Sequence, residues 1–243
     1  CKNTWIILVQ KPDASFMQKN DKHLLKCSYL SITERDMKNV KVASGKHKML
    51  FSVGIESDKF APVSVERQKQ LKQKYGFDVE KPLIIHVGHC SKGRGLEDFA
   101  KIHTAQRMVV ASGMFEDENV VRTLHEAKVT IHKGYLENVE EVYHMADAYL
   151  FPTRSAEFVI SIPLSVMEAL SCGVPVIGYK SFENLKEITD SEGGITLIDD
   201  AEQIDEVLSE VIKRKSDHSL LEKTSSWSAV AQSVLRMVRE ENA

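Results

Sequence analysis

The sequence predicts an α/β protein built around a doubly wound parallel sheet. Short β-branched runs alternate with amphipathic helical stretches from residue 83 onward, and the two periodicities switch repeatedly along the chain. Six such units within about 130 residues are typical of a Rossmann-like domain, whose ligands bind at the carboxyl ends of the strands. We therefore expect function in the loops that follow strands. The predicted strands are 83–87, 108–111, 129–132, 148–151, 174–178 and 195–198.

Apolar residues at helical spacing fill the intervals between these strands. Helices are predicted around 139–146 and over 204–212, and another begins near Pro163, because proline is preorganised for a first helical turn. The stretch 63–77 reads as a helix with four cations, and its thin apolar face favours a solvated surface over a membrane-binding patch. The apolar stripe within 227–238 predicts a helix with one face in a core.

Residues 1 to about 50 show the same alternation in miniature, with predicted strands at 5–9 and 28–32 and a polar helix around 16–25. Thr33 has the character of a helix N-cap. This segment looks like the tail of a second α/β unit. Because the chain begins with Cys1 rather than Met, we expect it to be a piece of a longer protein.

Composition limits the classes of function. With 32 Lys and Arg against 35 Asp and Glu, the net charge of −3 offers no global basic field for nucleic acid or an anionic membrane. No apolar run approaches the roughly 20 residues that span a bilayer. The four cysteines show no CxxC spacing, which favours reduced thiols over disulfides or structural zinc.

The first candidate site is the loop 88–99, which carries three glycines and the cations Lys92 and Arg94 between a strand and a helix. Glycine lets backbone N–H groups approach a phosphate, and a helix N-terminus adds positive potential. The loop matches neither GxGxxG nor the P-loop, so a plain surface turn stays an alternative. His86 and His89 lack a third ligand at metal-binding spacing, which argues against a metal site.

The second candidate site is the long loop after strand 148–151 and the helix that follows it. The backbone N–H groups of Leu164 and Ser165 are available to an anion at the start of this helix. Glu168, about one turn further, could accept hydrogen bonds from sugar hydroxyls. The alternative is a buried structural ion pair of Glu168 with Arg94 or Lys92.

The segment EALSCGVPVI at 168–177, followed by Glu187, resembles the "EAxxCGxPV…E" signature of the retaining family-four glycosyltransferases of the GT-B fold. Val53 to Pro62 is similar to that family's "NGID…FxP" interdomain linker. The segment 87–95 resembles its "VGR…KG" loop, and 129–152 resembles "VxFxGxV…ELxxxYxxADxxxxPS". The match covers roughly residues 50 to 212, and more loosely 1 to 50.

This resemblance implies the GT-B C-terminal domain, which is a Rossmann-like doubly wound sheet, with a remnant of a second Rossmann-like domain. It divides the chain at two boundaries. The implied parts are 1–50, the end of the N-terminal acceptor-side domain; 51–215, the nucleotide-sugar-binding domain; and 216–243, a C-terminal helix.

The resemblance also implies roles for single residues. Arg94 takes the place of the family lysine and, with Lys92, neutralises the donor's diphosphate, while Glu168 holds the ribose hydroxyls. Neither a metal nor another cofactor is expected, since cations and helix N–H groups supply the electrostatic stabilisation. The implied donor-binding residues are Gly88, Lys92, Arg94, Lys133, Gly134, Tyr135, Leu164, Ser165 and Glu168.

Two positions depart from the family pattern. His89 stands where the family has arginine, which replaces a permanent charge by one that depends on pH. Ile160 stands eight positions before Glu168, where the family has its first motif glutamate. Glu157 is the candidate replacement and, with Arg94, is predicted to be catalytic.

The sequence thus predicts part of a hexosyltransferase-type glycosyltransferase that takes a nucleotide-diphosphate sugar and acts with retention on a glycan, lipid-linked or small acceptor. We expect it in the cytoplasm or peripherally at the inner membrane face, with the remainder of its N-terminal domain as a partner, and without sugar transfer by this chain alone. The alternative is a nucleotide or nucleotide-sugar binding module without transfer activity, which Ile160 and His89 favour. A sugar-nucleotide epimerase would need an acid/base constellation that the sequence does not show.

Overall fold

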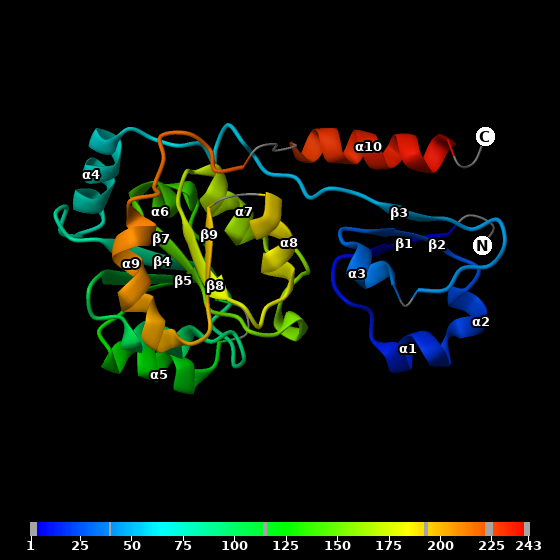
Figure 1. Ribbon diagram of the computed structural model, residues 1–243, viewed down its shortest axis with the longest axis horizontal. Coiled ribbons are helices and arrows are strands. Elements are labelled where there is room, and N and C mark those ends of the chain that lie inside the picture. Colours follow the sequence, from blue (N-terminus) through cyan, green and yellow to red (C-terminus); the bar gives the residue numbers. More distant parts are fainter. Residues whose placement is uncertain (1–3, 39, 114–115, 192–193, 222–225, 241–243) are drawn as a thin grey trace. The chain divides into compact units, whose positions relative to one another are not determined.

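The computed structural model describes residues 4–38, 40–113, 116–191, 194–221 and 226–240 of the chain. The chain folds into two compact units (Figure 1). Unit 1 comprises residues 1–55, 159–163 and 225–243, and unit 2 comprises residues 56–158 and 164–224.

Unit 2 is built on a parallel sheet of six strands in the order β6-β5-β4-β7-β8-β9. The chain runs from β4 outward to β6, returns to β7 beside β4, and continues outward to β9. The strand order therefore reverses between β4 and β7, which is the position where doubly wound sheets bind ligands. The strands are β4 (Leu83–Gly88), β5 (Gln106–Ala111), β6 (Thr130–Lys133), β7 (Ala148–Phe151), β8 (Val176–Tyr179) and β9 (Ile195–Ile198).

Helices cover both faces of this sheet, which confirms the predicted doubly wound α/β class (Figure 1). Leu96 and Phe99 from η1, Val120 from α5 and Leu208 from α9 share one apolar cluster with strand residues. On another part of the sheet, α6 contacts β4 and α7 contacts β7 and β8. The helical segments are α4 (Val65–Lys74), η1 (Leu96–Lys101), α5 (Glu118–Glu126), α6 (Glu140–Met145), η2 (Ala156–Phe158), α7 (Leu164–Ser171), α8 (Asn184–Ser191), η3 (Ala201–Gln203) and α9 (Ile204–Ile212).

The cations of α4 are largely engaged in ion pairs. Lys72, only 4% exposed, lies with its Nζ 2.6 Å from Asp147 Oδ2. Arg67 and Lys74 both pair with Glu141 of α6, at 3.2 and 2.5 Å. The predicted solvated face is therefore wrong for Lys72, which is buried. Arg67 and Lys74 stay about half exposed, and they pair with a carboxylate of α6 that a local pattern does not reveal.

Unit 1 contains a three-stranded parallel sheet in the order β1-β2-β3. The central strand β2 is buried throughout, and Tyr29 within it packs with Leu8, Met37 and Val40. Thr33 caps α3 as predicted, because its Oγ1 accepts from the backbone N–H of Asp36 at 3.2 Å. The elements are β1 (Trp5–Leu8), α1 (Ala14–Lys19), α2 (Asp21–Leu24), β2 (Ser28–Ser31), α3 (Glu34–Met37), β3 (Lys48–Leu50) and α10 (Trp227–Glu240).

Helix α10 is amphipathic, as its apolar stripe predicts, but the stripe is only partly buried. Val230 is 6% exposed, whereas Trp227 and Leu235 are 45% and 54% exposed. The prediction of core packing holds for Val230 and is wrong for the other two. The Trp227 indole and backbone instead lie 2.8 Å from the position of a Cβ on Gly54. None of the helices in the described segments combines the length and apolarity that crossing a membrane needs.

Candidate functional site

The loop after β4 turns back over the end of its own strand. The Arg94 side chain is buried at 6% exposure, and a Cβ on Gly88 would lie 2.9 Å from Arg94 Nη2 and 2.8 Å from His86 Nε2. A side chain at position 88 would therefore have to displace the ends of these two side chains. Burial lowers the pKa of Arg94, yet a guanidinium stays charged at neutral pH. The loop therefore holds a positive charge at the carboxyl end of β4.

This loop is fastened to the end of β7, across the switch point. The Thr153 hydroxyl donates to the Arg94 carbonyl at 3.2 Å. Gly95 has a φ of +75°, and a Cβ there would lie 2.4 Å from the Pro152 carbonyl oxygen. Only glycine adopts that backbone without strain at so close an approach. The segments after β4 and after β7 therefore form one connected structure.

Helix α7 begins at the same end of the sheet with Leu164 and Ser165 in its first turn. The first backbone N–H groups of a helix have no partner within the helix, and its dipole favours anions there. The Ser165 hydroxyl is bonded to Tyr149 of β7, whose phenol oxygen lies 2.8 Å away. The start of α7 thus offers backbone N–H donors, and the hydrogen bond between Ser165 and Tyr149 attaches this turn to strand β7.

Glu168 lies one turn further along α7 and is held by a tyrosine. The Tyr143 hydroxyl donates to Glu168 Oε2 at 2.7 Å. Burial raises the pKa of Glu168, and the hydrogen bond from Tyr143 acts in the opposite direction. The structure does not show the alternative ion pair of Glu168 with Arg94 or Lys92, because the residue that is hydrogen-bonded to Glu168 is Tyr143.

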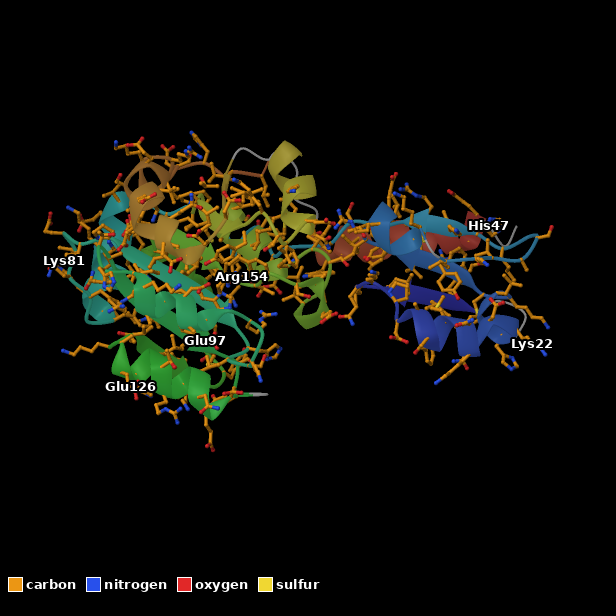
Figure 2. The ribbon with its side chains drawn as sticks, turned by 60° about the horizontal axis from the view of Figure 1, so that its bottom comes forward. Lys22, His47, Lys81, Glu97, Glu126 and Arg154 are labelled. Carbon is orange, nitrogen blue, oxygen red and sulfur yellow. The ribbon has the colours of Figure 1, made fainter. Side chains whose placement is uncertain are left out.

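Lys92 is exposed and lines an open hollow with Gly93, Gly95, Glu97 and Arg154. Arg154 and Glu97 are labelled in Figure 2, which shows these side chains on unit 2. The Arg154 guanidinium is itself fixed, with Nη1 2.8 Å from Asp98 Oδ2.

Tyr179 completes this arrangement. The Arg154 guanidinium lies 3.8 Å from the centre of the Tyr179 ring, and the Tyr179 hydroxyl donates to Asp98 Oδ2 at 2.7 Å. Sequence reasoning did not find this cluster.

The end of β6 and the loop after it carry three of the implied donor-binding residues, Lys133, Gly134 and Tyr135. The Tyr135 ring is 88% exposed, and Gly134 has a φ of +92° that suits glycine. Lys133 lies with its Nζ 2.8 Å from Glu116 Oε2, so its charge is compensated. A Cβ on Gly113 would lie 3.3 Å from the Cα of Gly134, so the loops after β5 and β6 approach each other closely.

Glu157 lies in the short helix η2, after β7, and its side chain is exposed. Its backbone N–H donates to the Ser155 hydroxyl at 3.3 Å, and its carboxylate forms no hydrogen bond or ion pair with the described residues. The predicted catalytic role of Glu157 remains a prediction. Ile160 belongs to unit 1 and is half-buried.

Sequence reasoning missed the residues that support the predicted ones, namely His86, Tyr143 and Tyr149. All three are fully buried, so their polar atoms need partners inside the protein. A tyrosine within an otherwise apolar strand such as AYLF at 148–151 is a signal that could have indicated a buried hydrogen-bond network. Among the described residues, no three His, Cys, Asp or Glu side chains gather as metal ligands.

The fold and the loops at its switch point place unit 2 among the doubly wound, Rossmann-like α/β proteins. Residues 81–237 match the sequence pattern of the family described as glycosyl transferases group 1. The chain therefore belongs to this family, and its architecture is that of GT-B glycosyltransferases.

Two curated relatives illustrate the similarity. The chain is 31% identical to N-acetyl-alpha-D-glucosaminyl L-malate synthase of Bacillus anthracis over 120 residues, which are 46% of this chain and 30% of that protein. It is 25% identical to the sulfoquinovosyl transferase SQD2 of Arabidopsis thaliana over 138 residues, or 54% of this chain and 26% of that protein. The matched part thus spans less than a third of either relative.

Solved structures share the fold across nearly the whole chain. A glycosyltransferase from Rickettsia africae superposes with a TM-score of 0.74 at 14% identity, covering 98% of this chain and 70% of that one. Anabaena Alr3699/HepE, in complex with UDP and glucose, also gives a TM-score of 0.74, at 12% identity and with 98% and 71% coverage. At these identities the similarity establishes the fold alone.

Proposed function

We propose that unit 2 binds the nucleotide-diphosphate sugar of a glycosyltransferase that transfers the sugar with retention of its anomeric configuration. The observation that carries the proposal is that the buried Arg94 guanidinium and the start of α7 both lie at the carboxyl ends of the adjacent strands β4 and β7. Family membership supports it, and so does the Anabaena structure that holds UDP and glucose.

The chemistry of the leaving group explains why a cation and helix N–H groups are useful here. When the bond from the sugar to the diphosphate breaks, negative charge develops on the diphosphate oxygens. Groups that are already oriented toward that charge lower the barrier, since they need no reorganisation during the reaction. In our proposal Arg94, Lys92 and the N–H groups of Leu164 and Ser165 stabilise this charge, so that neither a metal nor another cofactor is required.

Glu168 is proposed to accept hydrogen bonds from the ribose hydroxyls. A carboxylate offers acceptor positions on two oxygens, and Tyr143 occupies one position on Oε2. The remaining positions are available to hydroxyl donors. Tyr135, with Lys133 and Gly134, is proposed to border the base.

The test is calorimetric titration of the chain with UDP, GDP and ADP. We expect one nucleotide to bind, Arg94→Ala to weaken its binding by about 100-fold and Glu168→Gln by about 10-fold, because hydrogen bonds to charged groups contribute roughly 1.5–3 kcal/mol each. Arg122→Ala, which removes an exposed arginine of α5, is the matched control and should leave affinity unchanged. Binding that survives Arg94→Ala would contradict the proposed site.

The acceptor is proposed to be a glycan, a lipid-linked sugar or a small molecule, reached in the cytoplasm or at the inner membrane face, with further N-terminal protein as a partner. We propose that the present chain binds donor without transferring sugar, and glycosyl transfer by this chain would refute that part. The alternative of a binding module without transfer activity gains no support from the relatives, whose names denote a synthase and a transferase.

A further inference from the structure

A buried hydrogen-bond network lies beneath the first turn of α7, at the switch point of the sheet. Its centre is the Tyr149 hydroxyl, which lies 2.8 Å from Ser165 Oγ, 3.2 Å from the Val87 carbonyl oxygen and 3.3 Å from His86 Nδ1. Tyr149 and His86 are both fully buried. A phenol carries one proton, so Tyr149 can donate to only one of these three atoms at a time.

His86 cannot be the acceptor of that proton. Its Nδ1 lies 3.0 Å from the Leu150 carbonyl oxygen, which can only accept, so Nδ1 carries the hydrogen of the neutral ring. Burial and, secondarily, the charge of Arg94 lower the pKa of His86 to about 3, so the ring is neutral near neutral pH. The Tyr149 proton is therefore directed to Ser165 or to Val87.

A bound anion decides between these two acceptors. When Tyr149 donates to Ser165, the Ser165 proton is free to point away from the sheet. When Tyr149 donates to Val87, its phenol oxygen is an acceptor for the Ser165 proton, and a Ser165 hydroxyl that donates inward presents only lone pairs to a ligand. Phosphate oxygens accept and do not donate, so an anion at the start of α7 favours the first arrangement, which also has the shorter distance.

We propose that Tyr149 is a positioning residue that makes the Ser165 hydroxyl a hydrogen-bond donor toward the diphosphate of the nucleotide. This inference rests on the proposed function, because it deepens the role of Ser165 in the same site. Tyr149 acts through Ser165 and does not itself touch the ligand. Its contribution should disappear when Ser165 has no hydroxyl.

The test is a double-mutant cycle read by calorimetric titration with whichever of UDP, GDP or ADP binds. Ser165→Ala is expected to weaken binding by about 10-fold, because it removes a hydrogen bond to the charged diphosphate. Tyr149→Phe is expected to weaken binding by a measurable factor no greater than this, because it removes the neighbour that orients the Ser165 proton. The double variant should bind no more weakly than Ser165→Ala alone. Tyr149→Met, which also lacks the hydroxyl, is the second variant should Tyr149→Phe not fold, and the same pattern is expected.

Tyr29→Phe is the matched control, since it removes the hydroxyl of another fully buried strand tyrosine, in unit 1, which donates to the Leu24 carbonyl at 2.9 Å. It should leave affinity unchanged. Affinity unchanged in Tyr149→Phe, or a loss that adds in full to that of Ser165→Ala, would overturn the inference while a loss in Arg94→Ala upholds the proposed function. Absence of binding by the unchanged chain would overturn both.

Discussion

Replacing Gly173 by alanine is expected to lower the free energy of unfolding of unit 2 by about 3 kcal/mol or more. Gly173 follows α7 with a φ of +71°, where an L side chain costs about 1–2 kcal/mol. A Cβ there would also lie 2.3 Å from the Ser216 carbonyl oxygen and 2.9 Å from that of His218. Both atoms are backbone, so the segment after α9 would have to move as a whole.

Gly76 offers a matched control for this prediction. Its φ is +79°, and no atom lies within 4 Å of the position of its Cβ. Gly76→Ala therefore carries the conformational cost without the collision, and we expect a loss of about 1 kcal/mol. Urea unfolding followed by circular dichroism measures both variants. Equal losses in the two would show that the close approach at Gly173 costs nothing.

Acidification is expected to destabilise unit 2 through His86. The pKa of His86 is lowered to about 3 in the folded state, chiefly by burial, against an ordinary value near 6.5. His86 therefore binds a proton below about pH 6.5 in the unfolded state, but only near pH 3 in the folded state. The contribution of neutral His86 to the free energy of unfolding is therefore fully present above pH 6.5 and decreases as the pH falls toward 3. At pH 5 about 2 kcal/mol of it is lost.

His86→Phe isolates this contribution. The change in unfolding free energy between pH 7 and pH 5 should be about 2 kcal/mol smaller in this variant than in the unchanged protein, because the carboxylates titrate alike in both. His218→Gln is the control, since the His218 side chain is 87% exposed. If His86→Phe loses as much stability as the unchanged protein over this range, His86 is not the group responsible.

Local sequence pattern was enough to predict most of the sheet of unit 2. Strands β7 and β9 and helix α9 have the predicted bounds. Strands β4 and β5 differ by one or two residues at one end, and β6 and β8 differ by one or two residues at both ends. Strands β4, β7 and β8 are almost wholly buried, so their apolar signal is strong. Strand β3 was not predicted, since its three residues are exposed or half-buried and carry no such signal.

The candidate site was predictable only where its chemistry is local in sequence. Glycine, cations and a helix start within one loop indicate an anion site, as at Arg94 and Ser165. The partners of those groups come from other strands and helices. Tyr149 bonds to Ser165 of the helix that follows its own strand, but it reaches Val87 and His86 only because β7 neighbours β4. Tyr143 reaches Glu168 from α6. Strand order is a long-range property, and a single sequence does not encode it in any local window.

The division into two units has a spectroscopic consequence. The chain has two tryptophans, and both lie in unit 1, Trp5 in β1 and Trp227 in α10. Unit 2 has none, so tryptophan emission reports on unit 1 while the proposed nucleotide site has no such fluorophore. A change in that emission when nucleotide is added would therefore show that an event in one unit is transmitted to the other. Tryptophan fluorescence of the unmodified chain thus reports whether nucleotide binding to unit 2 changes unit 1.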